Sequence, residues 1–346
     1  MALLSSLDAV RRKVLHVFAP WLGSFYGSPS RRIAWAGTFG IVFALALSLR
    51  FPLALVALGP LVLGVPHLLS DVRYLVVKPG AHRRPLIVLL VLLPLAATWF
   101  FPKLEVGLLA LVGATLAART NLFRKAIAFG VVSALYAAAF TLPATFSLVF
   151  AHAHNFIAAV VLLCFSRSLR HALAPAIVFA VLSIVMLSGG FDGFSQYAAA
   201  SALRTGTDLR QAMWQYAPFC PNETTAIRFV VLFVFAQSVH YSIWLRLVPD
   251  EARPRKGLPS FSRSFRALRD DFGRVGLAGF AVASITFLAW GARDLEPARL
   301  GYLRFAAFHG YLELAFLALL VLEGREQWIP SLQPRAATSE PKGAIA

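Results

Sequence analysis

The sequence predicts an all-α, polytopic transmembrane helix bundle of about ten spans. Composition is the first reason. Hydrophobic residues make up 58 % of the 346 residues and charged residues only 14 %, whereas about 25 % of an ordinary soluble domain is charged. A globular core of this size cannot hide so much apolar surface, so lipid must surround most of the chain.

The second reason is the length and spacing of the apolar stretches. Each is close to the ~20 residues that cross the hydrocarbon core of a bilayer. We place the spans at 33–50, 53–77, 86–101, 104–118, 126–145, 147–165, 175–190, 225–247, 274–292 and 302–322. Pro143 and Thr145 separate the fifth span from the sixth.

The third reason is the distribution of charge along the chain, which has 33 Lys and Arg against 16 Asp and Glu. With ten spans, the basic clusters all fall in the segments on one side of the membrane, as cytoplasmic loops require. This predicts a multi-pass protein of the cell's inner or plasma membrane with both termini cytoplasmic. No nucleic-acid motif accompanies the positive charge, so nucleic acid is not an expected partner.

The same pattern divides the chain into three parts. Residues 1–32 are expected to form a cytoplasmic amphipathic segment, 33–323 the helix bundle, and 324–346 a disordered cytoplasmic tail. Two longer connections are expected to lie at the membrane surface. The first, 189–224, carries aromatic residues and is typical of amphipathic pieces, and the second, 249–273, is basic and suits anionic headgroups.

Five of the eight histidines lie inside predicted spans, where a polar side chain is costly and indicates function. They are His67, His152, His154, His240 and His309. The other three, His16, His82 and His171, lie at basic edges and are interpreted as surface residues.

Polar neighbours accompany the intramembrane histidines at helical spacing. His67 and Asp71 are four residues apart in the second span, as are His309 and Glu313 in the tenth, so each pair shares a helix face. In the sixth span His152 shares a face with Asn155, whereas His154 points elsewhere. In the eighth span Gln237 precedes His240 by one turn.

The four spans that carry these histidines are all even-numbered, so they cross the membrane in the same direction. At 1.5 Å per residue, three of them place a histidine ~16–21 Å from the inner edge, and the eighth places His240 ~9 Å from it. The imidazoles can therefore meet in one layer of the bundle, as in metal sites built from facing helices.

Imidazole suits zinc, copper, iron and nickel, and a ligating histidine usually gives its other N–H to a carboxylate or carbonyl group. Asp71 and Glu313 are placed either to orient the histidines or to bind the metal directly. The competing interpretation is that each histidine only forms hydrogen bonds between helices. Which of His152 and His154 is a ligand stays open at this point.

Four segments together resemble the Brp/Blh family of microbial membrane enzymes, which cleave β-carotene to retinal with dioxygen and iron. GVPHLLSD at 64–71 is similar to the family motif G-[IL]-P-H-G-x-x-D, and AHAHNF, FAQSVHYSIW and FHGYLEL follow in the family's order. Two positions depart from the pattern: Leu68 follows His67 in place of glycine, and Trp244 stands where the family has a second histidine.

The resemblance implies Fe(II) held by His67, His152 or His154, His240 and His309, with Asp71 and Glu313 as catalytic carboxylates. It also implies dioxygen and an apolar substrate, a carotenoid or another lipid. The leading hypothesis is therefore an integral membrane non-haem iron oxygenase. The alternatives are a proton or metal-ion transporter, a haem-binding electron carrier, and a lipid desaturase or hydroxylase, although no H-x-x-H-H cluster is present.

Overall fold

The computed structural model describes residues 2–18, 28–194, 208–253 and 260–329, and among these it is all-α, with no strand. Eight of its helices are long and apolar enough to cross a membrane, and two shorter apolar helices cover 85–97 and 104–117. These ten helices fall on the ten predicted spans. The predicted fold class is thus confirmed, and the chain is an integral membrane protein.

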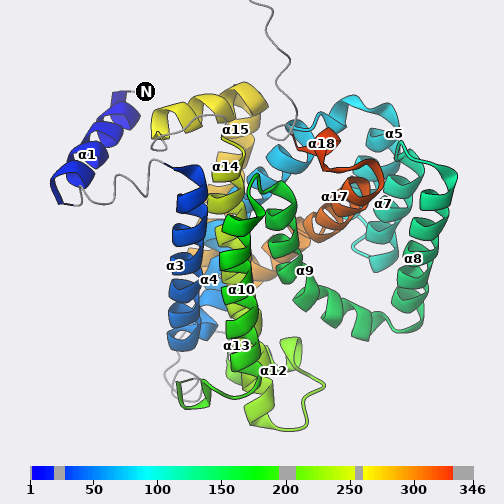
Figure 1. Cartoon of the computed structure of the whole chain (residues 1–346). Helices are drawn as coiled ribbons and strands as arrows, with labels where there is room; N and C mark the ends of the chain where they lie inside the picture. The colour runs from blue at the N-terminus through cyan, green and yellow to red at the C-terminus, as the bar shows by residue number, and fades with distance from the viewer. Residues whose placement is uncertain (1, 19–27, 195–207, 254–259, 330–346) are drawn as a thin grey trace, which may run out of the picture.

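Figure 1 shows the helices coloured along the chain. In chain order they are α1 (Ala2–Phe18), α3 (Pro29–Arg50), α4 (Pro52–Asp71), η2 (Val72–Val77), η3 (Ala81–Arg83), α5 (Pro85–Ile87), η4 (Val88–Leu92), α6 (Leu93–Ala97), α7 (Leu104–Ala117), α8 (Leu122–Thr141), α9 (Pro143–Phe165), α10 (Leu169–Leu187), α12 (Leu209–Tyr216), α13 (Glu223–Ser242), η5 (Ile243–Leu247), α14 (Val248–Glu251), α15 (Phe261–Arg293), α16 (Leu295–Phe305), α17 (His309–Glu323) and α18 (Arg325–Trp328).

Local sequence explains where several spans begin. Pro29, Pro52 and Pro143 lie at the first positions of α3, α4 and α9, where the missing N–H of proline costs nothing. Asn121 and Asn222 cap α8 and α13 by accepting a hydrogen bond from the backbone N–H three residues later. Proline and asparagine therefore separate neighbouring apolar runs into distinct helices.

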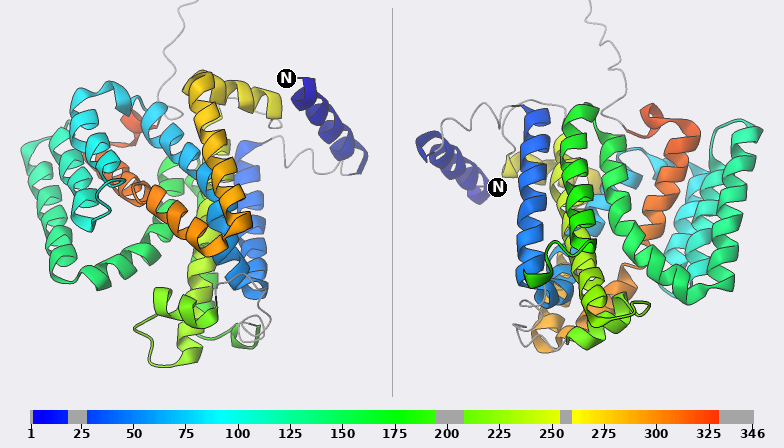
Figure 2. Two further views of the ribbon diagram at one scale, coloured as in Figure 1. Left: turned by 180° about the vertical axis from the view of Figure 1, so that it is seen from behind. Right: turned by 60° about the horizontal axis from the view of Figure 1, so that its bottom comes forward.

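Two spans form the centre of the bundle. The most apolar window of the span 223–251 is 72 % buried and that of 52–77 is 61 % buried, whereas the window in α15 is 0 % buried. α13 packs against α3, α4 and α9, and α15 covers α4 from outside (Figures 1 and 2). α4 and α13 carry His67 and His240, so the two most enclosed helices hold the central intramembrane histidines.

Three of the spans deviate from regular α-helix near these histidines. The second continues as the π-helix η2 directly after Asp71, and the eighth as the π-helix η5 directly after Ser242. The tenth breaks between Phe305 and His309, which separates α16 from α17. Such local irregularities are frequent at functional sites.

The two ends of the bundle are covered differently. α12 lies at one end, and its residues Ala212 and Tyr216 are buried against α13. α1, α18 and the first part of α15 lie at the other end (Figure 1). Gly273, at φ 69° and ψ 178°, turns α15 from this surface into the membrane-crossing direction, a backbone conformation that favours glycine.

The predicted terminal parts are described only in part. Of the predicted tail 324–346, residues Arg325–Trp328 form α18 and Trp328 is buried, and 330–346 lie outside the described residues. Of the predicted segment 1–32, α1 is an amphipathic helix and 19–27 lie outside the described residues.

α1 is attached to the bundle through Asp8. Its carboxylate accepts hydrogen bonds from the Ser260 hydroxyl at 2.6 Å, from the Phe261 N–H at 2.8 Å, and from both the N–H and the hydroxyl of Ser262. These donors form the N-terminus of α15, where the helix dipole favours a negative charge. The Ser260 hydrogen bond is the largest cause that lowers the pKa of Asp8 below its ordinary value of 3.8.

Because the folded pKa of Asp8 is depressed, this attachment is present above pH 3.8 and is lost only when the pH falls through the lower, folded value. Asp8→Ala should release α1 from α15 at neutral pH. Pulsed electron paramagnetic resonance between spin labels on α1 and α15 would show this as a broadened distance distribution. In the wild type the narrow distribution should persist at pH 4.

The matched control is Asp270→Ala, which removes an acid on α15 whose side chain is 67 % exposed. It should leave the distance distribution unchanged. An equally narrow distribution in Asp8→Ala would show that other contacts hold α1.

Candidate metal centre

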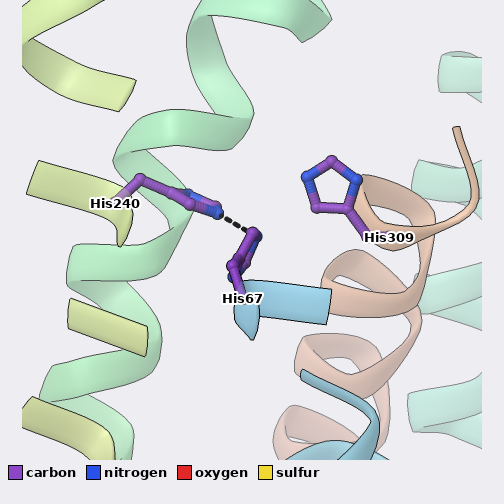
Figure 3. A group of neighbouring side chains, drawn as sticks. All are labelled: His67, His240 and His309. Carbon is purple, nitrogen blue, oxygen red and sulfur yellow. Dashed lines mark hydrogen bonds between the residues drawn. The ribbon is translucent and has the colours of Figure 1, made fainter. Parts of the chain in front are cut away.

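His67 belongs to a group of imidazoles from different helices. It is fully buried, and its Nε2 lies 2.9 Å from Nε2 of His240. The His309 ring stands edge-on to the His67 ring, with the centroids 5.2 Å apart. One ring nitrogen from each of the three residues lies within 4.8 Å of the others. Figure 3 shows the three side chains converging from α4, α13 and α17.

His154 of α9 completes the group. Its ring centroid lies 5.1 Å from that of His240 and 5.1 Å from that of His309. The structure therefore brings together four of the five predicted histidines, one from each of the four even-numbered spans that carry them. They form one layer of imidazoles inside the bundle.

His152 lies outside this group. Its Nε2 is 2.8 Å from the backbone carbonyl oxygen of Tyr216 in α12, and its ring contacts Phe229 and Phe233 of α13. Of the two alternatives that the AHAHNF segment left open, the structure therefore places His154 among the other histidines and His152 against α12.

The orientation of three of these rings is fixed by acceptors three or four residues away along the chain. Nδ1 of His154 lies 3.1 Å from the Ala151 carbonyl oxygen, Nδ1 of His309 lies 2.5 Å from that of Ala306, and Nδ1 of His67 lies 3.1 Å from Oδ1 of Asp71. An acceptor beside Nδ1 favours the tautomer with the proton on Nδ1. Nε2 is then left as a lone pair, which is the form that ligates a metal.

Two carboxylates flank the histidines. Asp71 faces His67 on its own helix, as the four-residue spacing predicts. Glu313, in contrast, has no contact of this kind with His309: its Oε1 accepts a 2.8 Å hydrogen bond from the Trp244 indole and lies 3.4 Å from Nε2 of His240. Glu313 therefore connects α17 to α13.

Trp244 joins three of the helices that build the site. Its indole donates to Glu313 on α17, and its backbone carbonyl accepts a 2.6 Å hydrogen bond from the Ser70 hydroxyl on α4. Trp244 itself lies in η5, the π-helical turn that follows α13. The sequence placed Trp244 one turn after His240, but nothing in it indicated the contact with Glu313.

The group of residues fits a cation. Asp71 and Glu313 are both fully buried, and both oxygens of Asp71 and Oε2 of Glu313 have no well-aligned hydrogen-bond donor among the described residues. Two such carboxylates repel each other strongly in a medium of low dielectric constant unless a positive charge lies nearby. Two nitrogens bound to one first-row metal at about 2.1 Å are at most about 4.2 Å apart, and the 2.9 Å between His67 and His240 falls within this limit.

Small residues next to the histidines allow the helices to approach. A Cβ atom at Gly64, one turn before His67, would lie 2.2 Å from the Tyr302 ring. A Cβ atom at Gly310, next to His309, would lie 2.9 Å from the Phe150 ring. Glycine at these two positions lets α16 pack on α4 and α17 pack on α9.

A cavity of about 180 Å³ adjoins the histidine layer. His154, His240 and His309 line it together with Asn155, Gln237, Tyr241, Tyr302 and residues of α12. From the sequence, Asn155 and Gln237 were named as polar neighbours of the intramembrane histidines, but both tyrosines were missed. Tyr241 directly follows His240 and could have been noticed, whereas Tyr302 is seven residues before His309 and carried no signal.

The α12 end of the cavity is held by a buried arginine. Arg299 of α16, which is 1 % exposed, donates to the Tyr216 hydroxyl at 2.9 Å and to the Gln215 side-chain oxygen at 2.8 Å. Glu296 in turn accepts from Arg299 at 2.7 Å. The two hydrogen bonds from Arg299 fix α12 over the cavity, and Glu296 on the same helix balances the charge of the arginine.

Comparisons with known proteins do not identify a family or a function for this chain. No protein-family model matches the chain, and no curated protein or solved structure matches it significantly.

The different positions of His152 and His154 lead to a prediction. His154→Ala should lower the affinity for a bound divalent metal by at least about tenfold, because it removes a ring from the histidine layer. His152→Ala should leave the affinity unchanged, because that ring contacts α12. Metal titration of the purified, metal-depleted protein measures both values, and loss of affinity only in His152→Ala would contradict the structure.

Proposed function

We propose that this chain is an integral membrane non-haem iron oxygenase, with Fe(II) held by His67, His154, His240 and His309. The observation that carries the proposal is the convergence of four buried imidazoles from four helices beside two buried carboxylates. Structural ion pairs rarely take this form, because nothing in the group supplies a permanent positive charge to balance Asp71 and Glu313.

The donor set favours a transition metal over the other cations common in proteins. Imidazole nitrogens suit iron, copper, zinc and nickel, whereas calcium and magnesium prefer oxygen ligands. The resemblance of the four segments to the Brp/Blh family favours iron among these metals. Iron bound there would supply the binding and activation of dioxygen.

The residues of the chain would orient and protect such a centre. Asp71, 3.1 Å from Nδ1 of His67, would fix the tautomer of that ring and raise its basicity. The Trp244 indole would hold Glu313 beside His240. Burial of the whole group would exclude bulk water, which suits the oxidation of an apolar substrate such as a carotenoid or another lipid.

We also propose that both termini face the cytoplasm. The end of the bundle that carries α1, α18 and the first part of α15 also carries the basic residues of these segments, including Arg12, Lys13, Arg263 and Arg266. Basic segments that flank spans stay on the cytoplasmic side. The α12 end would then face outward.

A second candidate function is transport of protons or metal ions through the same residues. It is favoured by the break of the tenth span between Phe305 and His309, because discontinuous helices with intramembrane ionisable residues are typical of transporters. Ion flux into proteoliposomes that depends on Asp71 and Glu313 would favour transport. Dioxygen consumption without flux would favour the oxygenase.

The proposal predicts the metal content of the protein. Protein purified in detergent should hold iron in near-stoichiometric amount, measured by elemental analysis, and its absorption spectrum should show no Soret band. His67→Ala should lose most of the iron, because this ring lies between the other imidazoles and Asp71. His82→Ala, which changes a histidine in the connection η3 after that span, is the control and should retain it.

Three results would count against this assignment. Wild-type protein without metal, or iron content unchanged in His67→Ala, would remove the metal centre. A Soret band would indicate haem instead of mononuclear or dinuclear non-haem iron.

A further inference from the structure

The cavity beside the histidines is lined by two side-chain amides whose hydrogen-bonding capacity is not fully used by the described residues. Asn155, which is 1 % exposed, uses its Nδ2 to donate to the Ala151 carbonyl oxygen of its own helix. Its Oδ1 is buried and has no hydrogen-bond donor among the described residues. No hydrogen bond joins the Gln237 amide to another residue that the structure describes, and both side chains line the cavity.

The other polar groups at the cavity have partners. Gln215 and Tyr216 accept hydrogen bonds from Arg299. Nδ1 of His154 and Nδ1 of His309 each face a backbone carbonyl oxygen three residues earlier in the chain. The Asn155 Oδ1 atom on α9 and the Gln237 amide on α13 are therefore the groups that a bound molecule would meet. An unpaired amide in an apolar surrounding is costly, so a molecule that pairs both is strongly favoured.

From these contacts we infer that the cavity binds the hydroxyl end of a long apolar molecule, with the hydroxyl between Asn155 and Gln237. A hydroxyl group both donates and accepts, so it can donate to Oδ1 of Asn155 and accept from the Gln237 amide. This inference rests on the proposed function, because it places the end of the substrate next to the candidate metal centre.

Other end groups fit these residues less well. A hydrocarbon end would leave both amides unpaired, and a carbonyl end has no hydrogen to give to Asn155. An ammonium group would lie beside a metal cation and be repelled. The lining includes no charged side chain, so a neutral group with one donor is the best match.

The size of the cavity limits what enters it. Its volume of about 180 Å³ is smaller than the roughly 300–1,000 Å³ of pockets that enclose a whole drug-sized ligand. A carotenoid or polyprenoid therefore places only one end there, and the remainder of the molecule lies elsewhere in the bundle or in lipid. The expected substrate class is a hydroxyl-ended carotenoid or a similar lipid alcohol.

Competition between two carotenoids tests the inference. β-Carotene and its dihydroxy counterpart zeaxanthin differ only in the hydroxyl group on each ring. Equal amounts of both are added to the purified, iron-loaded full chain in detergent, and the carotenoids retained after gel filtration are separated and quantified. Zeaxanthin should be retained over β-carotene by at least about tenfold, because a site that pairs a hydroxyl rejects the analogue without it.

Two variants separate the hydroxyl contact from general binding. The double variant Asn155→Leu and Gln237→Met keeps the side chains at similar size and should abolish the preference, while the iron content stays unchanged. Gln327→Met removes an exposed amide on α18, which lies at the opposite end of the bundle from α12 (Figure 1), and should keep the preference.

The possible outcomes distinguish this inference from the proposed function. Wild-type protein that holds iron but retains both carotenoids equally overturns the hydroxyl site and leaves the metal centre intact. A preference for zeaxanthin that survives in the double variant also overturns it. Wild-type protein without iron that still prefers zeaxanthin supports the hydroxyl site and removes the oxygenase proposal.

Discussion

The structure depends on the burial of two carboxylates beside four imidazoles at the centre of the bundle. Asp71 and Glu313 are fully enclosed, and each would be very costly there alone. In such a place a carboxyl group is either neutral by protonation or paired with a positive charge, and both states need the surrounding helices to hold a defined geometry. α4 and α13, the two most buried spans, supply His67 and His240, and Trp244 ties them to Glu313. The two most buried spans therefore surround the two carboxyl groups that are most costly to bury.

The irregular backbone around the site is stabilised by the residues of the site itself. The break between α16 and α17 leaves the Ala306 carbonyl without its regular helical partner, which is costly inside a membrane. Both the N–H of His309, at 3.1 Å, and its Nδ1, at 2.5 Å, lie against that oxygen. In the π-helical turn at Trp244, the backbone carbonyl oxygen of Trp244 likewise gains a hydrogen bond from a side chain, the Ser70 hydroxyl. The contacts that close these gaps also orient the side chains of the histidine layer.

The spans and the pairing of His67 with Asp71 could be predicted from the sequence, because apolar length and helical spacing determine them locally. The same four-residue spacing predicted that Glu313 would pair with His309, but Glu313 contacts Trp244 and His240 instead. Its partners are determined by how α17 packs against α13. The choice between His152 and His154 depended on the rotation of α9 about its axis, and neighbouring helices fix that rotation. Tyr302 reaches the cavity only because Gly64 leaves room for its ring, a contact between helices far apart in the chain.

The segment that contains His152 and His154 contacts both α12 and the histidine layer. Residues two apart on a helix point about 200° apart, so a ring at 154 in the histidine layer places the ring at 152 on another side of α9. There it contacts the Tyr216 carbonyl, in the helix that Arg299 fixes from α16. A rotation of α9 that moved His154 away from His240 would also pull His152 from α12. The position of α12 over the cavity and the completeness of the histidine layer are therefore coupled through a single turn of helix.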